Sequence, residues 1–179
     1  MAKNNNKKPV ETVKYKERFS DGSCIEYYEK DGKKHGEVIR FYADGSVNWI
    51  GIYKDGLREK TLKVFRNDGT LESECEYKKG LIQGMKKYYS DGKTIYQTTD
   101  IKDGVVQGSI IYYRNDGTKI SEAKFKDGKP DGSKVMYRAD GETVLKEVPY
   151  EGIIREFGVN GKTVKETEYS KKKEANTTK

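Results

Sequence analysis

The segment Phe125-Lys126-Asp127-Gly128-Lys129-Pro130-Asp131-Gly132 recurs, with variations, along nearly the whole chain. Related versions begin at Glu29, Tyr77 and Ile101, and each again ends on a glycine. Asp-Gly between strand-like runs is a strong hairpin signal, because glycine has no Cβ and aspartate tolerates the left-handed backbone region. A turn that returns at a regular spacing indicates a repeat protein built from β-hairpins.

A second family of turns, an aromatic residue followed shortly by Asp-Gly, lies between successive copies of this segment. The period is about 24 residues until the last repeat, which is shorter. Two turns per period mean two strands per period. We therefore expect an all-β fold: an elongated, twisted antiparallel sheet of tandem hairpin repeats with about fourteen strands. The structural turns are predicted at Gly45, Gly56, Gly69, Gly80, Gly92, Gly104, Gly117, Gly128 and Gly141.

Aromatic residues are predicted to form two columns across this sheet. The first column holds the residue four positions before each glycine of the aromatic turn family, namely Phe41, Phe65, Tyr88, Tyr113, Tyr137 and Phe157. The second column holds Tyr53, Tyr77 and Phe125, with Ile101 interrupting it. Adjacent residues of a strand point to opposite faces, so neighbours of the first column are expected on the other face.

One further glycine follows the hairpin turn in the pattern Asp-Gly-Lys-x-x-Gly, at Gly36, Gly84, Gly108 and Gly132. We interpret it as a point of close backbone approach, where the chain enters the next strand. Lys60 occupies this place in the second repeat, which predicts a local departure from the regular structure there.

Composition agrees with a thin structure whose repeats bury little surface. The 179 residues are 33% hydrophobic and 36% charged, with mean hydropathy −0.99. The stretches before Val10 and after Tyr169 each carry +3 of the net charge of +7, so the remainder is nearly neutral. We expect disordered basic tails at 1–12 and 170–179 around a repeat array at 13–169.

The combined pattern, Gly-x-x-x-x-Tyr-x-x-Asp-Gly followed by Tyr-x-Asp-Gly-Lys-x-x-Gly, resembles MORN-type repeats, specifically the MORN-variant repeats of the YwqK-like bacterial antitoxin family. The resemblance covers about 13–169 and is best from Gly84 to Gly132. It implies β-hairpin repeats, a non-enzymatic role and an antitoxin-like function in a toxin–antitoxin system. Since repeat arrays share a scaffold and differ in partner, no binding residue is carried over from the family.

Enzymatic function is not expected. The chain has no Gly-x-Ser-x-Gly, phosphate-loop or His-Glu-x-x-His motif, and its single histidine, His35, is predicted to lie in an exposed loop. Cys24 and Cys75 are interpreted as small, half-buried strand residues without a disulfide between them. We expect no catalytic residues, no metal and no cofactor.

The predicted activity is binding of another protein, a bacterial toxin or other effector, with Tyr42, Trp49, Tyr89 and Tyr112 as candidate contact residues. In the alternative interpretation these side chains cover a second small core. Binding of nucleic acid or of an anionic membrane surface is the alternative function, suggested by pI 9.1 and interleaved lysine and tyrosine. A cytoplasmic location is predicted, since neither a signal peptide nor a membrane span is visible; an export signal removed beforehand is the alternative.

Overall fold

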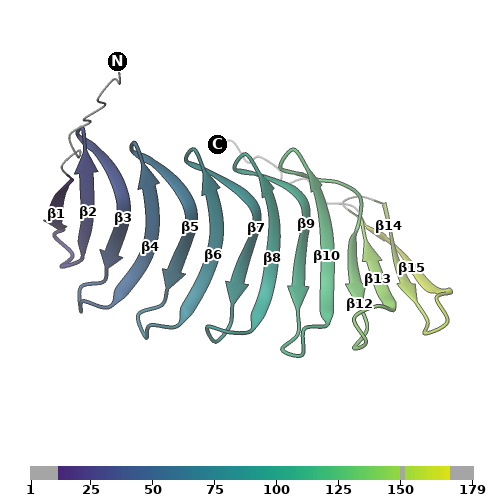
Figure 1. Ribbon diagram of the computed structural model, residues 1–179. Coiled ribbons are helices and arrows are strands. Elements are labelled where there is room, and N and C mark those ends of the chain that lie inside the picture. The colour runs from purple at the N-terminus through teal and green to yellow at the C-terminus, as the bar shows by residue number, and fades with distance from the viewer. Residues whose placement is uncertain (1–11, 150–151, 170–179) are drawn as a thin grey trace, which may run out of the picture. The chain divides into compact units, whose positions relative to one another are not determined.

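The structure, a computed structural model, describes residues 12–149 and 152–169. The predictions for the tails 1–12 and 170–179 lie outside the described residues, apart from Thr12. The chain divides into two compact units, Met1–Leu81 and Ile82–Lys179. Each unit is described by itself below, with the strands labelled as in Figure 1.

Unit 1 is an antiparallel meander in which each strand pairs with the next one along the chain (Figure 1). Its strands are β1 (Val13–Arg18), β2 (Cys24–Lys30), β3 (Lys33–Phe41), β4 (Val47–Lys54), β5 (Leu57–Phe65) and β6 (Leu71–Lys78).

Unit 2 continues the same pattern from β7, whose first residue is the last of unit 1. The short strand β11 pairs only with β10, and β10 also pairs with β12. The strands are β7 (Leu81–Tyr89), β8 (Ile95–Lys102), β9 (Val105–Tyr113), β10 (Lys119–Lys126), β11 (Lys129–Pro130), β12 (Lys134–Tyr137), β13 (Val144–Val148), β14 (Gly152–Phe157) and β15 (Thr163–Tyr169).

The prediction of an all-β, antiparallel fold of hairpin repeats is confirmed. The described residues form fifteen strands and no helix, against about fourteen strands expected. It follows that, in the part of the chain that the structure describes, no helix is long and apolar enough to cross a membrane.

The Asp-Gly hairpin turns have the backbone that two-residue loops need. Asp55 and Gly56 both have positive φ, 52° and 85°, as a type I′ turn requires. The amide of Gly56 donates to the carbonyl of Lys34 at 2.9 Å, and the amide of Gly80 donates to the carbonyl of Arg58 at 2.8 Å. Each turn thus closes its own hairpin and also bonds to the preceding one.

In the aromatic turn family, the aspartate binds the residue after the turn glycine. Asp44 accepts hydrogen bonds from the amide and the hydroxyl of Ser46, at 2.9 and 2.7 Å. Asp68 accepts the same pair from Thr70, at 2.9 and 2.6 Å. These bonds hold the pKa of both aspartates below the ordinary value of 3.8.

The interpretation of the third glycine family as a close approach is wrong at three of its four positions. A Cβ added at Gly36, Gly84 or Gly132 would meet nothing within 4 Å, and only Gly108 is crowded, by Asp100. Their shared property is positive φ, between 81° and 114°. Lys60 has φ 60° and keeps this conformation, so the predicted local departure does not occur. The lysine adopts a backbone that glycine would adopt without strain.

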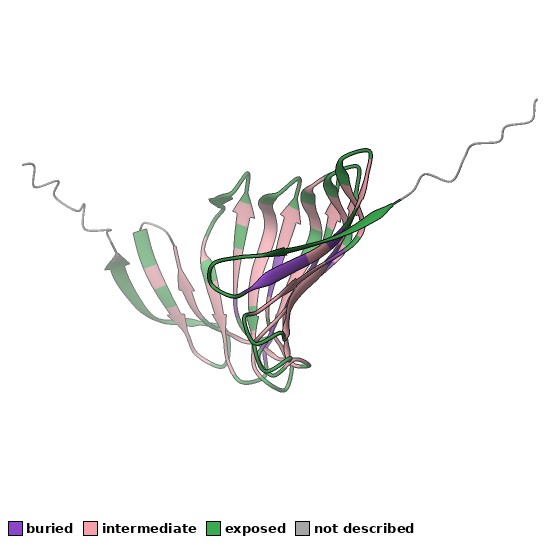
Figure 2. Cartoon of the chain, turned by 90° about the vertical axis from the view of Figure 1, so that its left-hand side faces the viewer, coloured by how far each residue is buried: buried purple, intermediate pink, exposed green. Residues whose placement is uncertain are grey.

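The best-packed part of unit 1 is a small cluster of Ile25, Tyr27 and Val38, with Trp49 and Tyr53 packed against it. Val38 is fully buried, at 0% exposed. In Figure 2 the buried residues of β2 stand out beside the wholly exposed edge strand β1. A single-layer sheet leaves most other side chains half-buried, so few residues define the core.

The first predicted aromatic column is wrong at one member in unit 2. In β7 the residue that closes the last strand pair before the turn is Tyr89, opposite Ile95, and Tyr88 instead pairs with Gln97. The amide of Ser90 bonds to the carbonyl of Thr94, so this turn has its glycine one place earlier than in the other repeats. The corresponding closing residues elsewhere are Phe41, Phe65, Tyr113, Tyr137 and Phe157.

Candidate partner-binding surface

Register and strand alternation sort the side chains of unit 1 onto two faces. Trp49 lies opposite Arg40 on β3, and Tyr53 lies opposite Arg58 on β5. We call the face that carries these residues the Trp49 face; its members are Glu17, Ile25, Tyr27, Glu29, Lys34, Val38, Arg40, Trp49, Tyr53, Arg58, Leu62 and Tyr77. The opposite face, called the Phe41 face, carries Lys16, Glu26, Ile39, Phe41 and Ile50.

Arg58 is the centre of the Trp49 face. Its guanidinium carbon lies 5.3 Å from the ring centroid of Trp49, 5.9 Å from that of Tyr53 and 5.4 Å from that of Tyr77. The Nε–H donates to the hydroxyl of Tyr53 at 2.9 Å, and an Nη1–H donates to the hydroxyl of Tyr77 at 3.4 Å. Three aromatic residues from β4 and β6 thus hold one cation from β5 in a fixed orientation. We call Trp49, Tyr53, Arg58 and Tyr77 the arginine cluster.

The environment keeps Arg58 charged. Burial lowers the pKa of its guanidinium, but the hydrogen bond and charge interaction with Tyr53, followed by those with Tyr77, outweigh burial and leave the pKa raised. A guanidinium has five N–H donors, and the two tyrosines use two of them, so three remain. The cluster therefore presents a half-buried, permanently charged group with unused donors.

The other cations of the Trp49 face are also placed over rings. The Arg40 guanidinium lies 4.5 Å from the ring centroid of Phe19, and it donates to the hydroxyl of Ser23 at 3.0 Å. The Lys34 ammonium lies 4.4 Å from the ring centroid of Tyr27. Among the described residues, no carboxylate forms an ion pair with Lys34, Arg40 or Arg58.

The Phe41 face has different electrostatics. Glu26 accepts from Lys14 at 2.9 Å and from Lys16 at 2.8 Å. Hydrogen bonds from Lys16 and then Lys14 lower the pKa of Glu26 to about 2. The lysines of this face are therefore compensated by a carboxylate within the sheet. Within the described residues, the cations of the Trp49 face form no ion pair of this kind, and Arg40 interacts with the charge of Asp21 only at longer range.

The structure places two of the predicted contact residues in unit 1 in different settings. Trp49 contacts Arg58 in the arginine cluster and also packs against the buried residues of the core. Tyr42 follows β3, and its hydroxyl donates to the carbonyl of Phe65, one repeat further on, at 2.9 Å. Tyr42 thus has a clear structural role in linking two repeats.

The two predicted contact residues in unit 2 also differ from one another. Tyr89 is only 8% exposed and closes the strand pair next to its turn, so it offers little surface. Tyr112 is 39% exposed on β9, with the Lys134 ammonium 5.8 Å from its ring centroid. Of the four predicted residues, Trp49 alone belongs to the arginine cluster.

Arg58, Tyr53 and Tyr77 were not among the sequence-predicted contact residues. One sequence signal could have pointed to Arg58: it follows the residue after a turn glycine, where other repeats have Lys34, Ile82, Val106 and Pro130. Arg58 is the only arginine among these positions, and it lies between two members of the Tyr53–Tyr77 column.

The histidine and the cysteines have structural settings. The prediction of an exposed loop for His35 is wrong, because it lies in β3 with 32% of its side chain exposed and its Nδ1 3.4 Å from the Asp55 carboxylate. The turn before it is only two residues long, so β3 begins earlier than the sequence pattern suggested. Cys24 and Cys75 are both buried, and no disulfide joins them.

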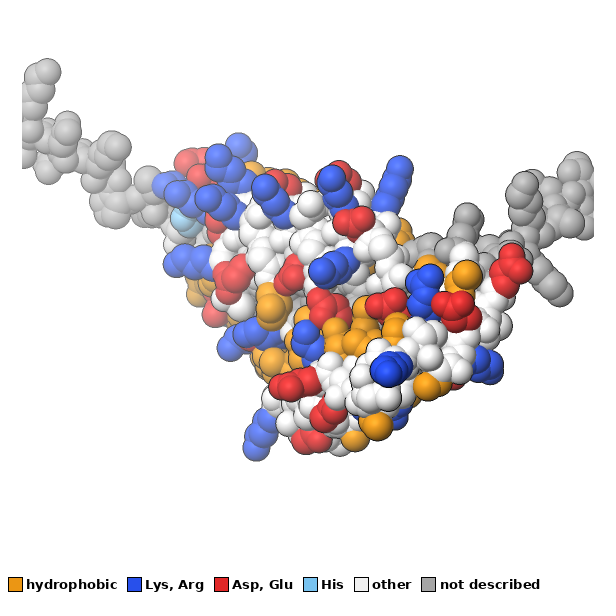
Figure 3. Space-filling view, turned by 90° about the vertical axis from the view of Figure 1, so that its right-hand side faces the viewer, with side chains coloured by type: hydrophobic (Ala, Val, Ile, Leu, Met, Phe, Trp, Pro, Cys, Tyr) orange, Lys and Arg blue, Asp and Glu red, His pale blue; other side chains and the backbone are white. Residues whose placement is uncertain are grey.

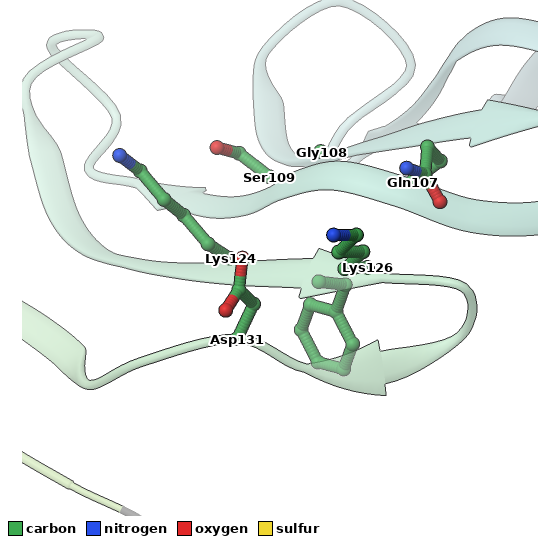
Figure 4. A pocket seen from close by; sticks show the side chains of 7 residues that line it. Gln107, Gly108, Ser109, Lys124, Lys126 and Asp131 are labelled. Atoms are coloured by element: carbon green, nitrogen blue, oxygen red, sulfur yellow. The ribbon is translucent and has the colours of Figure 1, made fainter.

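A pocket of about 370 Å³ in unit 2 lies where β10 changes its partner from β11 to β12 (Figure 4). Gln107 and Ser109 border it from β9, Lys124 and Lys126 from β10, and Asp131 from the following loop. In Figure 4 Lys124 and Lys126 point in different directions, so they do not converge on one ligand position. Within the described residues, no group of three or more His, Cys, Asp or Glu side chains is arranged to hold a metal ion.

Comparison with known proteins leaves the family open. No family model matches the chain, and a search of curated proteins gave no match. The resemblance to MORN-variant repeats thus stays a prediction from the sequence pattern, and function is inferred from the surface of the molecule itself.

Proposed function

We propose that the chain is a non-enzymatic protein-binding scaffold that acts in the cytoplasm as an antitoxin-like inhibitor of a bacterial toxin or other effector protein. The observation that supports this most is the arginine cluster, in which Arg58 lies among Trp49, Tyr53 and Tyr77. Trp, Tyr and Arg are the residues that most often dominate binding energy at protein interfaces.

The form of the sheet also supports protein binding. Side chains of the Trp49 face such as Trp49 and Tyr77 are half-buried within unit 1, and neighbouring strands hold them in register. Preordered aromatic groups lose little conformational entropy when a partner covers them. A surface of this kind can bind a folded protein without rearrangement.

The test is binding of the full chain to the purified product of a neighbouring gene, measured by light scattering after size exclusion and by calorimetry. We expect a complex of fixed stoichiometry, weakened by at least about tenfold in Trp49→Ala, as expected for an interface anchor. Val105→Ala, at an exposed position in unit 2, is the matched control and should leave the affinity unchanged. A growth assay then asks whether the chain suppresses toxicity of that product.

Two results would contradict the proposal. One is a complex whose affinity is equal in the wild type and in Trp49→Ala. The other is an affinity that falls steeply with salt and is reproduced by DNA, RNA or anionic vesicles, which would support the alternative of a nucleic-acid or membrane-surface binder.

A further inference from the structure

The cations of the Trp49 face suggest what kind of partner surface this face recognises. Lys34, Arg40 and Arg58 each lie over an aromatic ring, at 4.4 to 5.9 Å from ring centroids. Stacking on a ring orients a guanidinium and leaves its N–H edge open to an acceptor. We propose that the Trp49 face binds an acidic segment of a partner protein, with Asp or Glu carboxylates between apolar side chains; this inference rests on the proposed function.

Charge compensation differs between the two faces of unit 1. On the Phe41 face, Glu26 compensates Lys14 and Lys16 at 2.9 and 2.8 Å. On the Trp49 face, the described residues supply no ion pair for Arg40 or Arg58. On that face Glu17 accepts a hydrogen bond from the hydroxyl of Tyr27 and is occupied by it. The charge of Asp21 interacts with Arg40, and Glu29 lies opposite Lys34 in register. Arg58 has charge interactions only with tyrosines among the described residues, so a carboxylate from outside would complete its electrostatics.

The guanidinium groups have the geometry to bind such a carboxylate. Arg58 has three unused N–H donors after its bonds to Tyr53 and Tyr77. Arg40 uses one donor on Ser23. Two adjacent N–H groups of a guanidinium match the two oxygens of a carboxylate, and such bidentate pairs are among the strongest hydrogen-bonded contacts. Trp49 is paired with Arg40 in register and lies against Arg58, so an apolar contact is flanked by two cations.

The overall charge of unit 1 favours an acidic protein over nucleic acid. Residues 12–81 contain fourteen Lys and Arg against thirteen Asp and Glu, so the field of unit 1 is weak at long range. The surface on the side of the C-terminal strands, which Figure 3 shows, likewise carries Lys and Arg side chains interspersed with Asp and Glu. Phosphate-driven binding needs several uncompensated cations along a path. Three ring-stacked cations around an apolar centre fit short acidic and apolar peptide segments better.

The chain carries its own reporter for the experiment. Trp49 is the only tryptophan, so its fluorescence reports on this face alone. The probe is a twelve-residue synthetic peptide of Glu with Leu and Phe, titrated into the full-length chain; pairs of Glu alternate with pairs of apolar residues, so each side of the extended peptide presents both kinds of side chain. We expect a saturable change in Trp49 emission. The same peptide with Lys in place of Glu, and a single-stranded oligonucleotide, should give none.

Variants assign the effect to the guanidinium groups. Arg58→Gln should weaken the affinity for the acidic peptide by at least about tenfold, as expected when a charged anchor is removed. Arg58→Lys keeps the charge, loses the planar donors and should give an intermediate loss. Arg40→Gln repeats the test at a second site, in case Arg58 variants unfold. Lys14→Gln, on the Phe41 face, is the matched control and should bind as the wild type does.

The inference is overturned if the acidic peptide gives no saturable change, if Arg58→Gln and Arg40→Gln both bind it as tightly as the wild type, or if the oligonucleotide binds equally well. A chain that binds a protein partner through Trp49 but ignores the acidic peptide would overturn this inference and leave the proposed function standing. A chain that binds the peptide but no protein partner would contradict the proposed function and leave the recognition of acidic segments standing.

Discussion

The hydroxyl of Tyr42 donates a hydrogen bond to the backbone carbonyl of Phe65, 23 residues further along the chain, at 2.9 Å. The bond joins the end of β3 to the same place in the next repeat. Arg114 makes the corresponding contact in unit 2, where it donates to the carbonyl of Tyr137 at 3.1 Å. The position after the column residue therefore links each of these repeats to its successor.

Replacing Tyr42 by phenylalanine should lower the free energy of unfolding by about 1 kcal/mol, the typical net contribution of one hydrogen bond. Urea denaturation of the full chain measures it. Tyr28→Phe is the control, because Tyr28 is 38% exposed and the described residues show no hydrogen bond at its hydroxyl. Equal stability of both variants would show that the Tyr42 bond contributes nothing.

Lys60→Gly should raise the free energy of unfolding by about 0.5–1 kcal/mol. Lys60 has φ 60°, and a side chain in this region costs about 1–2 kcal/mol, from which the extra backbone entropy of glycine in the unfolded chain is subtracted. Lys60→Ala keeps the strained backbone and serves as the control. A destabilised Lys60→Gly would mean that the lysine side chain makes a contact worth more than the strain.

The opposite substitution at two related glycines should cost unequal amounts. Gly84→Ala and Gly108→Ala both place a side chain at positive φ, which costs about 1–2 kcal/mol. At Gly108 the new Cβ would also lie 2.9 Å from the Cβ of Asp100, whose carboxylate accepts from the amide of Ser109 at 3.0 Å. The midpoint of thermal unfolding should therefore be lower for Gly108→Ala than for Gly84→Ala. The reverse order would contradict this explanation.

Acid should weaken the fold through the turn aspartates. Backbone hydrogen bonds from Thr94 and Lys93, then the Thr94 hydroxyl, lower the pKa of Asp91 to about 2 from 3.8. A lowered folded-state pKa means that the stabilisation is complete above the unfolded pKa and is lost as the pH falls through the folded one. The urea midpoint should drop between about pH 4 and about pH 2.

Asp91→Asn tests the cause of that drop. The amide oxygen can still accept hydrogen bonds but does not titrate, so the variant should lose less stability on acidification than the wild type. If both proteins lose stability equally, the acid sensitivity arises elsewhere, for example at Glu26, whose pKa is also about 2.

The fold could be predicted from the sequence because its determinants are local. Asp-Gly at a period of about 24 residues specifies the hairpins, and the order of the strands follows from connections too short for any other pairing. What failed depended on single residues. Lys93 lengthens one side of the turn at Gly92, which exchanges the positions of Tyr88 and Tyr89. The spacing of the turn glycines is uneven here, with 23 residues from Gly69 to Gly92 and 25 from Gly92 to Gly117, and this unevenness marks the shifted turn.

The surface was harder to predict for a physical reason. The sequence indicates Trp49 because it is a rare aromatic residue on a strand. Its contact with Arg58, however, depends on the conformation of the long arginine side chain, which reaches from β5 to the ring on β4. Strand periodicity gives the face of a residue and not the reach of a flexible arginine. Tyr42 was predicted as a contact residue because it follows a member of the first column. Its hydroxyl instead donates a hydrogen bond to a backbone carbonyl of the sheet.

The bond from the amide of Gly80 to the carbonyl of Arg58 joins one hairpin to its neighbour, and the same bond recurs from Gly56 to Lys34. A gene built from such repeats can gain or lose one by unequal recombination. At the new junction, the amide of a turn glycine would still donate to a carbonyl of the preceding hairpin. Length can then vary in whole steps during descent, while under the proposed function an arginine in place of Ile82 or Val106 would alter recognition in a single repeat. Growth and specificity can therefore evolve separately in a chain of this design.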